Sequence, residues 1–472
     1  SAYREIEQKF PQPGFVEHNP DEIWQTSIQC AQEVLSQSRI EPRQIAGIGI
    51  TNQRETVILW DRKTGKPLFN AIVWQCRRSA SICEKLKEKG LEEEVRARTG
   101  LVIDPYFTAT KIMWLRDHAP GVKDKIARNE VCAGNVDAWL IWNLTGGKSH
   151  ATDYSNASRT MLFNVKSLRW DDLLLQETGI PQTILPEPRP SSGLFGYTDE
   201  KVFFGARIPI MGVAGDQQAA LFGQACFQPG MAKNTYGTAL VAVVNIGEHF
   251  IPSQNKLMTD LLWEVGGRVS YGFEGIVFTG GAVVQWLRDG MKIIEKASET
   301  EALANQVPDT GGVYIVPAFN GLSSPYWDPY ARGTIIGITR GTTREHLTRA
   351  VLESIAYQTR DLLEAMISDS GNKLSSLRVD GGATANNFLM QFQADLLGIP
   401  IEKPVITEMT ALGVAYLAGL GAGLWQSQDE IAAQWKIARV FEPKMSEDRR
   451  EALYAVWKKA VERSFGWAKY GV

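Results

Sequence analysis

The chain has 472 residues and a mass of 52.4 kDa, with 44% hydrophobic and 22% charged residues. These values exclude a wholly disordered or fibrous protein and a small disulfide-dependent scaffold, and they predict several domains with ample core. Fifty Lys and Arg against 53 Asp and Glu give a net charge of −3. This balance argues against a nucleic-acid or anionic-membrane surface as the main partner, because those partners need a basic protein surface.

The cysteines and the apolar segments indicate a compartment. Five cysteines lie far apart without a CxxC pair, which favours free thiols in a reducing environment. No apolar run approaches the roughly 20 residues of a membrane span, and the first residues lack the apolar stretch of a signal peptide. We therefore expect a cytoplasmic enzyme without membrane insertion.

Strand patterns alternate with helical patterns along most of the chain, which predicts an α/β protein. Asn19 and Pro20 offer an N-cap and a first helical residue, and the apolar stripe that follows predicts a helix of about four turns. The pattern restarts near residues 224–230, where we expect a domain boundary. Further strands are expected at 45–51, 56–61, 71–74 and 208–215, helices at 80–89, 108–117, 217–223, 345–367 and 385–397, and a hairpin at 232–244.

Two familiar phosphate-binding motifs fail on inspection. Residues 47–52 begin like a dinucleotide-binding fingerprint, but Asn52 occupies the third glycine position. Residues 146–149 resemble the end of a P-loop, but Trp142 stands where its first glycine belongs. No histidine or cysteine cluster has zinc-ligand spacing.

Polar and glycine-rich corners follow several apolar strands. Asp216 begins a helix after one strand, where it is either a catalytic base or an N-cap aspartate. Arg54 and Glu55 lie between two strands, either as a hydroxyl-binding pair near Trp74 or as a surface ion pair. Three more corners, 236–238, 278–285 and 380–387, suit either a nucleotide or a plain turn.

The order and spacing of these corners resemble the FGGY carbohydrate kinases, and within that family the members that phosphorylate glycerol. The similarity extends from residue 2 to near the C-terminus. The motifs that carry it are FPQPGFVEH (10–18), TNQRET (51–56), AIVWQCRR (71–78), GDQQAALFG (215–223) and DGGA (380–383), with the two family signatures at 106–118 and 333–353.

The resemblance implies two ribonuclease H-like domains of the actin, Hsp70 and hexokinase superfamily, at 1–224 and 225–472, with an interdomain cleft. It implies that Asp216 is the catalytic base and a magnesium ligand. The partners implied are glycerol and Mg²⁺ with ATP or ADP, in a homodimer or homotetramer. The implied glycerol-binding residues are Arg54, Glu55, Trp74, Tyr106, Asp216 and Gln217, and the implied ATP-binding residues are Thr238, Gly281, Gln285, Gly382 and Asn386.

The sequence departs from the family pattern at Val241 and at its beginning, and one further loop matches only in part. Val241 replaces a phenylalanine that the family often places opposite Trp74, which leaves open a kinase for another polyol or a sugar. Gly205 and Arg207 match a fructose 1,6-bisphosphate loop of some relatives, but the residues before them do not resemble a phosphate-binding stretch. Residues 3–8 resemble only the family's third strand.

The family's opening hairpin, which holds magnesium and phosphate, is not found in the sequence. We therefore expect residues 1–472 alone to fold poorly and to leave glycerol unphosphorylated, and a chain extended by those strands to do both. A catalytically silent, glycerol-binding homologue is the alternative from another functional class.

Overall fold

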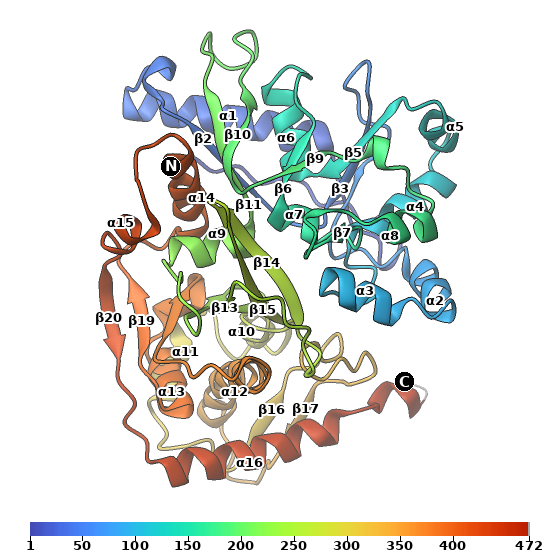
Figure 1. The fold of residues 1–472 in the computed structure, drawn as a ribbon. Coiled ribbons are helices and arrows are strands. Elements are labelled where there is room, and N and C mark those ends of the chain that lie inside the picture. Colours follow the sequence, from blue (N-terminus) through green and yellow to red (C-terminus); the bar gives the residue numbers. More distant parts are fainter. Residues whose placement is uncertain (471–472) are drawn as a thin grey trace.

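The computed structural model describes residues 1–470, which form two α/β halves that meet along the middle of the molecule (Figure 1). The first half ends with helix α9 at Gly223. Its elements are β1 (Glu17–His18), α1 (Pro20–Ser38), β2 (Ile48–Asn52), β3 (Val57–Asp61), β4 (Ala71–Ile72), α2 (Ala80–Glu88), α3 (Glu92–Thr99), α4 (Thr108–His118), α5 (Val122–Ala127), β5 (Val131–Asn135), α6 (Val136–Leu144), β6 (Ala151–Asp153), α7 (Tyr154–Ser158), β7 (Phe163–Asn164), β8 (Arg169–Trp170), α8 (Asp172–Thr178), β9 (Glu187–Arg189), β10 (Ser192–Tyr197), β11 (Pro209–Gly215) and α9 (Asp216–Gly223).

The second half is built on one large mixed sheet. Within residues 1–470 this sheet has seven strands in the order β14-β15-β13-β12-β18-β19-β20. Its elements are β12 (Ala232–Tyr236), β13 (Leu240–Gly247), β14 (Met258–Val265), β15 (Arg268–Val277), α10 (Ala282–Gln285), α11 (Glu299–Ala304), β16 (Tyr314–Val316), β17 (Thr334–Ile336), α12 (Arg344–Ser370), β18 (Leu377–Asp380), α13 (Asn387–Leu397), β19 (Ile401–Pro404), α14 (Met409–Gly421), α15 (Gln428–Ala432), β20 (Ile437–Phe441) and α16 (Glu447–Ser464).

Within the described residues the first half has four smaller sheets: one in the order β1-β4-β3-β5, one in the order β10-β11-β2, and the two-stranded sheets β6-β9 and β7-β8. Strands β11 and β2 run parallel, with Gly215 opposite Asn52, so their carboxyl ends meet at the same edge. The loops that follow both strands therefore lie next to each other. This edge positions the candidate site.

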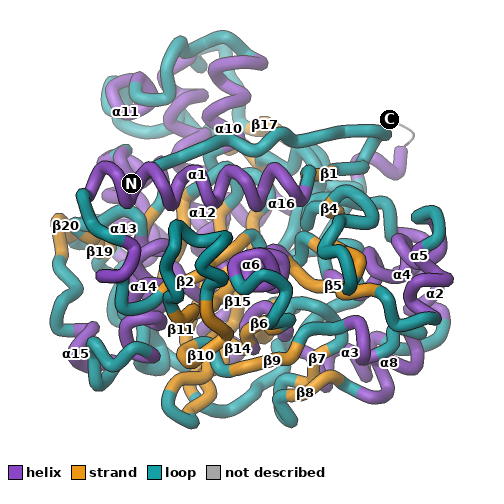
Figure 2. Tube along the Cα trace, turned by 90° about the horizontal axis from the view of Figure 1, so that it is seen from above, coloured by secondary structure: helices purple, strands orange, loops and turns teal. Residues whose placement is uncertain are grey.

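Helix α14 connects the two halves. Although it follows β19 of the large sheet, it packs on β2, β10 and β11 of the first half (Figures 1 and 2) and contacts α9. The contact is backbone to backbone, because a Cβ on Gly413 would lie 1.8 Å from the carbonyl oxygen of Ala219, and one on Gly49 would lie 2.5 Å from that of Val414. Glycine is needed at both positions for this close approach.

Most of the predicted elements are confirmed. The Asn19 side chain accepts a hydrogen bond from the Asp21 amide at the start of α1, and the predicted hairpin is β12 and β13, paired antiparallel. The strands β2, β3, β4 and β11 and the helices α2, α4, α9, α12 and α13 all overlap their predicted ranges. The expectation for residues 3–8 is wrong: they form no strand, because no described strand lies alongside to pair with them, and most of them are exposed.

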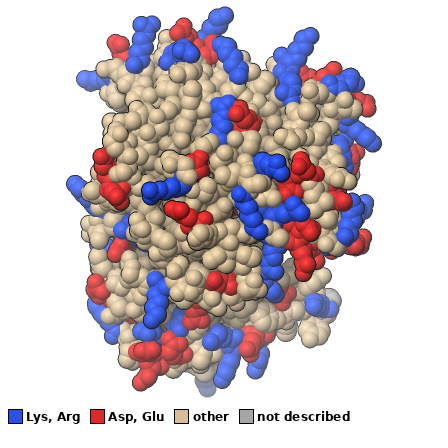
Figure 3. All heavy atoms as spheres, in the orientation of Figure 1, with Lys and Arg blue, Asp and Glu red and all other residues tan. Residues whose placement is uncertain are grey.

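Charge and hydropathy at the surface match the balanced composition. On the face in Figure 3, basic and acidic side chains are interspersed over both halves. Among residues 1–470 we find no helix with the length and apolar character needed to span a bilayer.

The C-terminal helix is attached through a buried carboxyl group. On α12, Asp361 accepts hydrogen bonds from the Tyr454 hydroxyl at 2.7 Å and the Trp457 indole at 2.9 Å, both on α16. Burial raises the pKa of Asp361 from its ordinary 3.8 to about 7. The folded state therefore holds this proton over a pH range in which the unfolded chain has released it.

We predict that this group makes the protein less stable as the pH rises from about 4 to 7, by up to about 1.4 kcal/mol per pH unit. Asp361→Asn has no proton to release, so the decline of its Tm between pH 5 and 7.5 should be shallower than that of the parent. Thermal melting across pH tests this, with exposed Asp429→Asn as control. Equal slopes for Asp361→Asn and parent would contradict the assignment.

Candidate active site

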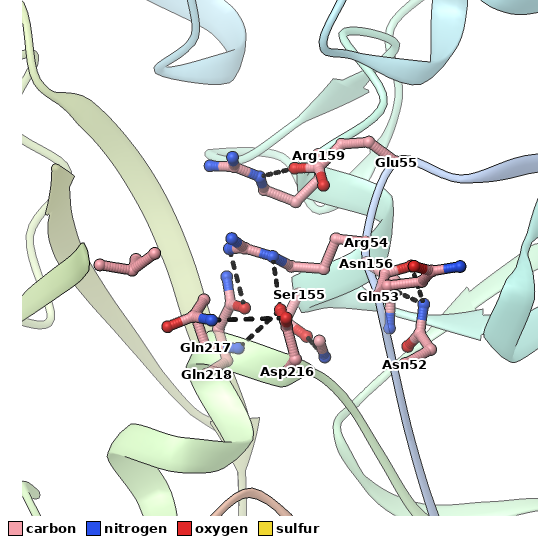
Figure 4. Close-up of polar contacts among 12 residues, drawn as sticks. Asn52, Gln53, Arg54, Glu55, Ser155, Asn156, Arg159, Asp216, Gln217 and Gln218 are labelled. Atoms are coloured by element: carbon pink, nitrogen blue, oxygen red, sulfur yellow. Dashed lines mark hydrogen bonds and ion pairs between the residues drawn. The ribbon is translucent and has the colours of Figure 1, made fainter. Parts of the chain in front are cut away.

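Asp216 lies where β11 ends, beside the loop that follows β2 (Figure 4). Its Oδ1 forms an ion pair with Nε of Arg54 at 3.0 Å and accepts a hydrogen bond from the Gln217 amide at 2.8 Å. A Cβ on Gly215 would lie 2.5 Å from the Arg54 side chain, so glycine at this position permits the approach. The carboxylate is 37% exposed, which leaves it accessible to a substrate.

The N-cap interpretation of Asp216 is wrong. Helix α9 has Gly215 as its N-cap and no side-chain capping bond, and Asp216 is already its first residue. The carboxylate thus contributes no hydrogen bond to the helix beyond the next amide. Its free capacity to accept a proton fits the alternative prediction, a catalytic base.

Arg54 and Glu55 are not a surface ion pair either, because both side chains are buried and each pairs elsewhere. Arg54 binds both carboxylate oxygens of Glu274 on β15, at 2.6 and 3.0 Å. Glu55 accepts from Nε of Arg159 at 2.5 Å. Glu55 also has a φ of 58°, a strained left-handed conformation for a residue other than glycine, which the surrounding contacts must maintain.

Two aromatic rings border the same region. Trp74 and Tyr106 pack edge to face with centroids 5.7 Å apart, and the Arg159 guanidinium lies 5.6 Å from the Tyr106 ring. The buried Lys111 ammonium donates to the backbone carbonyls of Tyr106 and Phe107, which fixes the loop that presents Tyr106. Burial raises the pKa of the Tyr106 phenol, so this hydroxyl stays protonated and able to donate.

Gln217 is oriented by a buried lysine from the second half. Lys233 on β12 donates to Oε1 of Gln217, and also to the Thr235 hydroxyl at 2.8 Å and the Val241 carbonyl at 3.3 Å. Oε1 of Gln217 is thereby occupied, and its amide nitrogen lies 3.4 Å from Oδ2 of Asp216. Val241 is itself buried on β13.

The candidate ATP residues lie on corners of the second half. Thr238, in the turn between β12 and β13, accepts at its carbonyl from the amides of Gly280 and Ala282, so two of the corners are in contact. The third corner follows β18, which pairs in parallel with β12. A Cβ on Gly382 would have no neighbour within 4 Å, so space is open there.

The remaining three candidates lie at helix ends. Gly281 is the N-cap of α10, and its amide donates to the Gly237 carbonyl at 2.8 Å. Asn386 caps α13, accepting from the Leu389 amide at 3.0 Å and donating to Thr300 at 3.1 Å. Gln285 ends α10 with an exposed side chain. No hydrogen bond among the described residues links Asn386 or Gln285 to the Thr238 corner.

Three charged residues of this region were not found from the sequence. Arg159 follows α7, and Asp260 and Glu274 lie on β14 and β15. With Arg54 and Glu55 they form a buried charge cluster, in which all five side chains are 3% exposed or less. The available signal was that Asp260 and Glu274 each interrupt an otherwise apolar strand pattern, where an unpaired charge would be costly.

Burial raises the pKa values of the carboxyl groups in the cluster, and the arginines lower them. Burial raises the pKa of Asp260 above its ordinary range, and the neighbouring Glu274 carboxylate adds to the shift. Burial acts on Glu274 too, but Arg159 and Arg54 together hold its pKa below the usual range. The arginines therefore favour the charged form of Glu274, while burial disfavours that of Asp260.

The described residues were searched for a group of side chains that could hold a metal ion. Among residues 1–470 no group of three or more His, Cys, Asp and Glu side chains has a geometry that could hold one. Asp216 nevertheless fits Mg²⁺, because this ion is usually held by one or two carboxylates together with the substrate's phosphates.

Comparison with known proteins identifies the family. The N-terminal domain of the FGGY family of carbohydrate kinases matches residues 1–223, and its C-terminal domain matches residues 232–422. The chain belongs to the FGGY family of carbohydrate kinases. Among FGGY kinases it is 60% identical to glycerol kinase 2 of Thermotoga maritima over 466 residues, which covers 99% of this chain and 94% of that protein.

Other FGGY kinases agree. Glycerol kinase of Carboxydothermus hydrogenoformans is 59% identical, with 99% of this chain and 93% of that protein covered. The crystal structure of Plasmodium falciparum glycerol kinase with ADP superposes with a TM-score of 0.92 at 39% identity, covering 98% of this chain and 92% of that one. The predicted two-domain α/β fold of the superfamily is thereby confirmed.

Proposed function

We propose that this FGGY kinase transfers the γ-phosphoryl group of ATP to glycerol and produces sn-glycerol 3-phosphate. The observation that carries the proposal is Asp216, accessible and paired with Arg54, at the joint carboxyl edge of β11 and β2. The similarity to glycerol kinases over nearly the whole chain supports the same substrate. Arg54, Glu55, Tyr106, Asp216 and Gln217 would bind the hydroxyl groups, and Trp74 would cover the carbon atoms.

The reaction needs a proton acceptor beside a fixed alcohol. The glycerol oxygen attacks the γ-phosphorus in line; the new O–P bond forms while the bond from phosphorus to the β,γ-bridging oxygen breaks, and ADP leaves. Asp216 takes the hydroxyl proton. Fixing several hydroxyl groups in a buried site favours glycerol over water, because remote binding energy orients the nucleophile. Mg²⁺, when bound by Asp216 and the phosphates, supplies charge neutralisation.

We further propose that residues 1–224 act as the glycerol-binding domain and residues 225–472 mainly as the ATP-binding domain. Thr238, Gly281, Gln285, Gly382 and Asn386 would contact ATP. In support, the candidate glycerol residues precede Ala225 and the five candidate ATP residues follow it. ATP binding by Gly382→Leu, measured by calorimetry, tests the assignment; unchanged affinity would contradict it, since the side chain would fill the open space.

The remaining parts of the proposal are location and assembly. We propose a cytoplasmic homodimer or homotetramer. All five cysteines are free, which fits a reducing compartment. Exposed aromatic side chains near the C-terminus, including Phe465 and Trp467, fit a subunit contact. Sedimentation of the purified protein tests the assembly, and a monomer at micromolar concentration would contradict it.

Substrate choice is tested by ADP release with a panel of glycerol, four- and five-carbon polyols and ketopentoses. We expect glycerol to give the highest kcat/KM. A higher value for a larger polyol would favour the alternative kinase activity, which the small Val241 side chain would accommodate. Glycerol binding by calorimetry without ADP release would instead favour the catalytically silent homologue.

Glu55→Gln should raise the KM for glycerol by about 10-fold, while the KM for ATP changes less than about twofold. The amide keeps the shape and one hydrogen bond to Arg159, but it loses a charge-assisted interaction worth about 1.5 kcal/mol. Steady-state kinetics with each substrate varied measures the two constants. The control is Glu353→Gln, another buried glutamate paired with an arginine. Equal weakening of both substrates would contradict the binding role.

A further inference from the structure

Arg54 is held from the opposite half of the molecule. It lies in the loop after β2, whereas the carboxylate that binds it belongs to Glu274 in the middle of β15. Glu274 lies opposite Val243 of β13 and Met258 of β14, so its backbone is fixed on both sides by the large sheet. The fork-to-fork pair at 2.6 and 3.0 Å is the geometry in which an arginine is most strictly oriented.

This pairing determines which edge of the guanidinium faces Asp216. Both Nη atoms contact Glu274, and Nη1 also donates to Gln218 at 3.2 Å. Nε is the guanidinium atom that pairs with Asp216, as an ion pair at 3.0 Å from Oδ1 (Figure 4). Without the Glu274 fork, Nη1 would keep only Gln218 at 3.2 Å and Asp260 at 3.5 Å, and Nη2 would lose its hydrogen bond, so the guanidinium would be held less strictly.

A second arginine, Arg159, links Glu55 to the carboxylates of the second half. Arg159 donates to Glu55 at 2.5 Å with Nε and to Asp260 at 2.5 Å with Nη1, and its Nη2 lies 3.1 Å from Glu274. Arg54 directly and Glu55 through Arg159 are therefore connected to carboxylates of the second half. Stability alone is a poor explanation for such a cluster, because desolvation offsets most of the attraction in a buried ion pair.

We propose that Glu274 is a positioning residue for glycerol binding: it orients Arg54 from the second half, so that the glycerol site is complete only with the two halves together. The proposal rests on the proposed function, since it assigns glycerol as the molecule that Arg54 binds. Glu274 itself need not touch glycerol. Its main effect passes through Arg54, which it binds with two hydrogen bonds, whereas its contact with Arg159 is a single ion pair at 3.1 Å; the experiment separates the two routes.

The test is a double-mutant cycle with glycerol binding measured by calorimetry and with steady-state kinetics. Glu274→Gln should raise the Kd and KM for glycerol by about 10-fold and change the KM for ATP less than about twofold. In an Arg54→Lys background, which lacks the fork, Glu274→Gln should change the glycerol Kd by less than about twofold. An equal factor in both backgrounds would overturn the proposal.

A second variant guards against a folding defect. Glu274→Asp keeps the charge but withdraws the carboxylate by one methylene, so it should also weaken glycerol binding while the protein melts cooperatively. Parental glycerol affinity in Glu274→Asp would overturn the proposal, as would a comparable loss in the control Glu353→Gln. Failure of the proposed function is recognised separately, because the parent itself would then release no ADP with glycerol, and the cycle would be run with the preferred polyol.

Discussion

Asp216→Asn should lower kcat by about 10²- to 10⁴-fold and leave the glycerol Kd within about 10-fold of the parent value. The amide oxygen can still face Nε of Arg54 and accept from the Gln217 amide, so the shape of the site and much of its hydrogen bonding remain. The amide cannot take the hydroxyl proton. The substitution should therefore lower kcat far more than it raises the glycerol Kd.

Single-turnover phosphorylation measures the chemical step, and calorimetry measures glycerol binding. A matched control is Asp172→Asn, an exposed aspartate that also begins a helix, α8. It should retain parental turnover. Near-normal turnover in Asp216→Asn would refute the base assignment, and a large loss of glycerol affinity with unchanged chemistry would reduce Asp216 to a binding residue.

Gly413→Ala should have the largest effect on stability. The added Cβ would lie 1.8 Å from the Ala219 carbonyl oxygen and 2.7 Å from the Gly223 amide nitrogen. These are backbone atoms of α9, so no side-chain rotation relieves the clash and the two helices must move apart. Overpacking typically costs about 1–3 kcal/mol, and we expect at least the upper value here.

Asp216 is the first residue of α9, so the displacement should also reduce kcat. Thermal melting and steady-state kinetics measure the two effects. Gly341→Ala is the control, because the nearest atom to its Cβ would be 3.8 Å away and its φ is not left-handed. An unchanged Tm together with full activity in Gly413→Ala would contradict the prediction, because it would show that α14 and α9 can move apart without loss of stability.

Local patterns predicted the elements well, for identifiable physical reasons. The first helix has a capping asparagine and a proline in its first turn, and the hairpin at 232–244 consists of two antiparallel strands joined by a short turn. Both signals act within a few residues. By contrast, the return of α14 to the first half was not predicted, since the sequence does not show which sheet a helix joins.

The site could be predicted in part. Asp216 was found because a strand, a glycine and a helix follow one another in sequence, but only the coordinates show that Gly215 caps the helix. Arg54 and Glu55 are adjacent, and adjacency suggested a pair. Their real partners, Glu274 and Arg159, lie more than 100 residues away, at separations of 220 and 104. Pairs between residues so far apart have no characteristic spacing in the sequence, so they could not be predicted from it.

The packing of α14 on the first half also determines whether the two halves can fold and unfold independently. A cut after Gln224 would not release an independent first domain, because the faces of β2 and β11 around Gly49 and Gly212 would lose the helix that covers them. We therefore expect a fragment of residues 1–224 to expose apolar sheet surface and to aggregate unless a partner fragment with 409–421 is co-expressed. In the intact chain, the same helix makes the two halves one cooperative unit, whose calorimetric and van't Hoff enthalpies of unfolding should coincide.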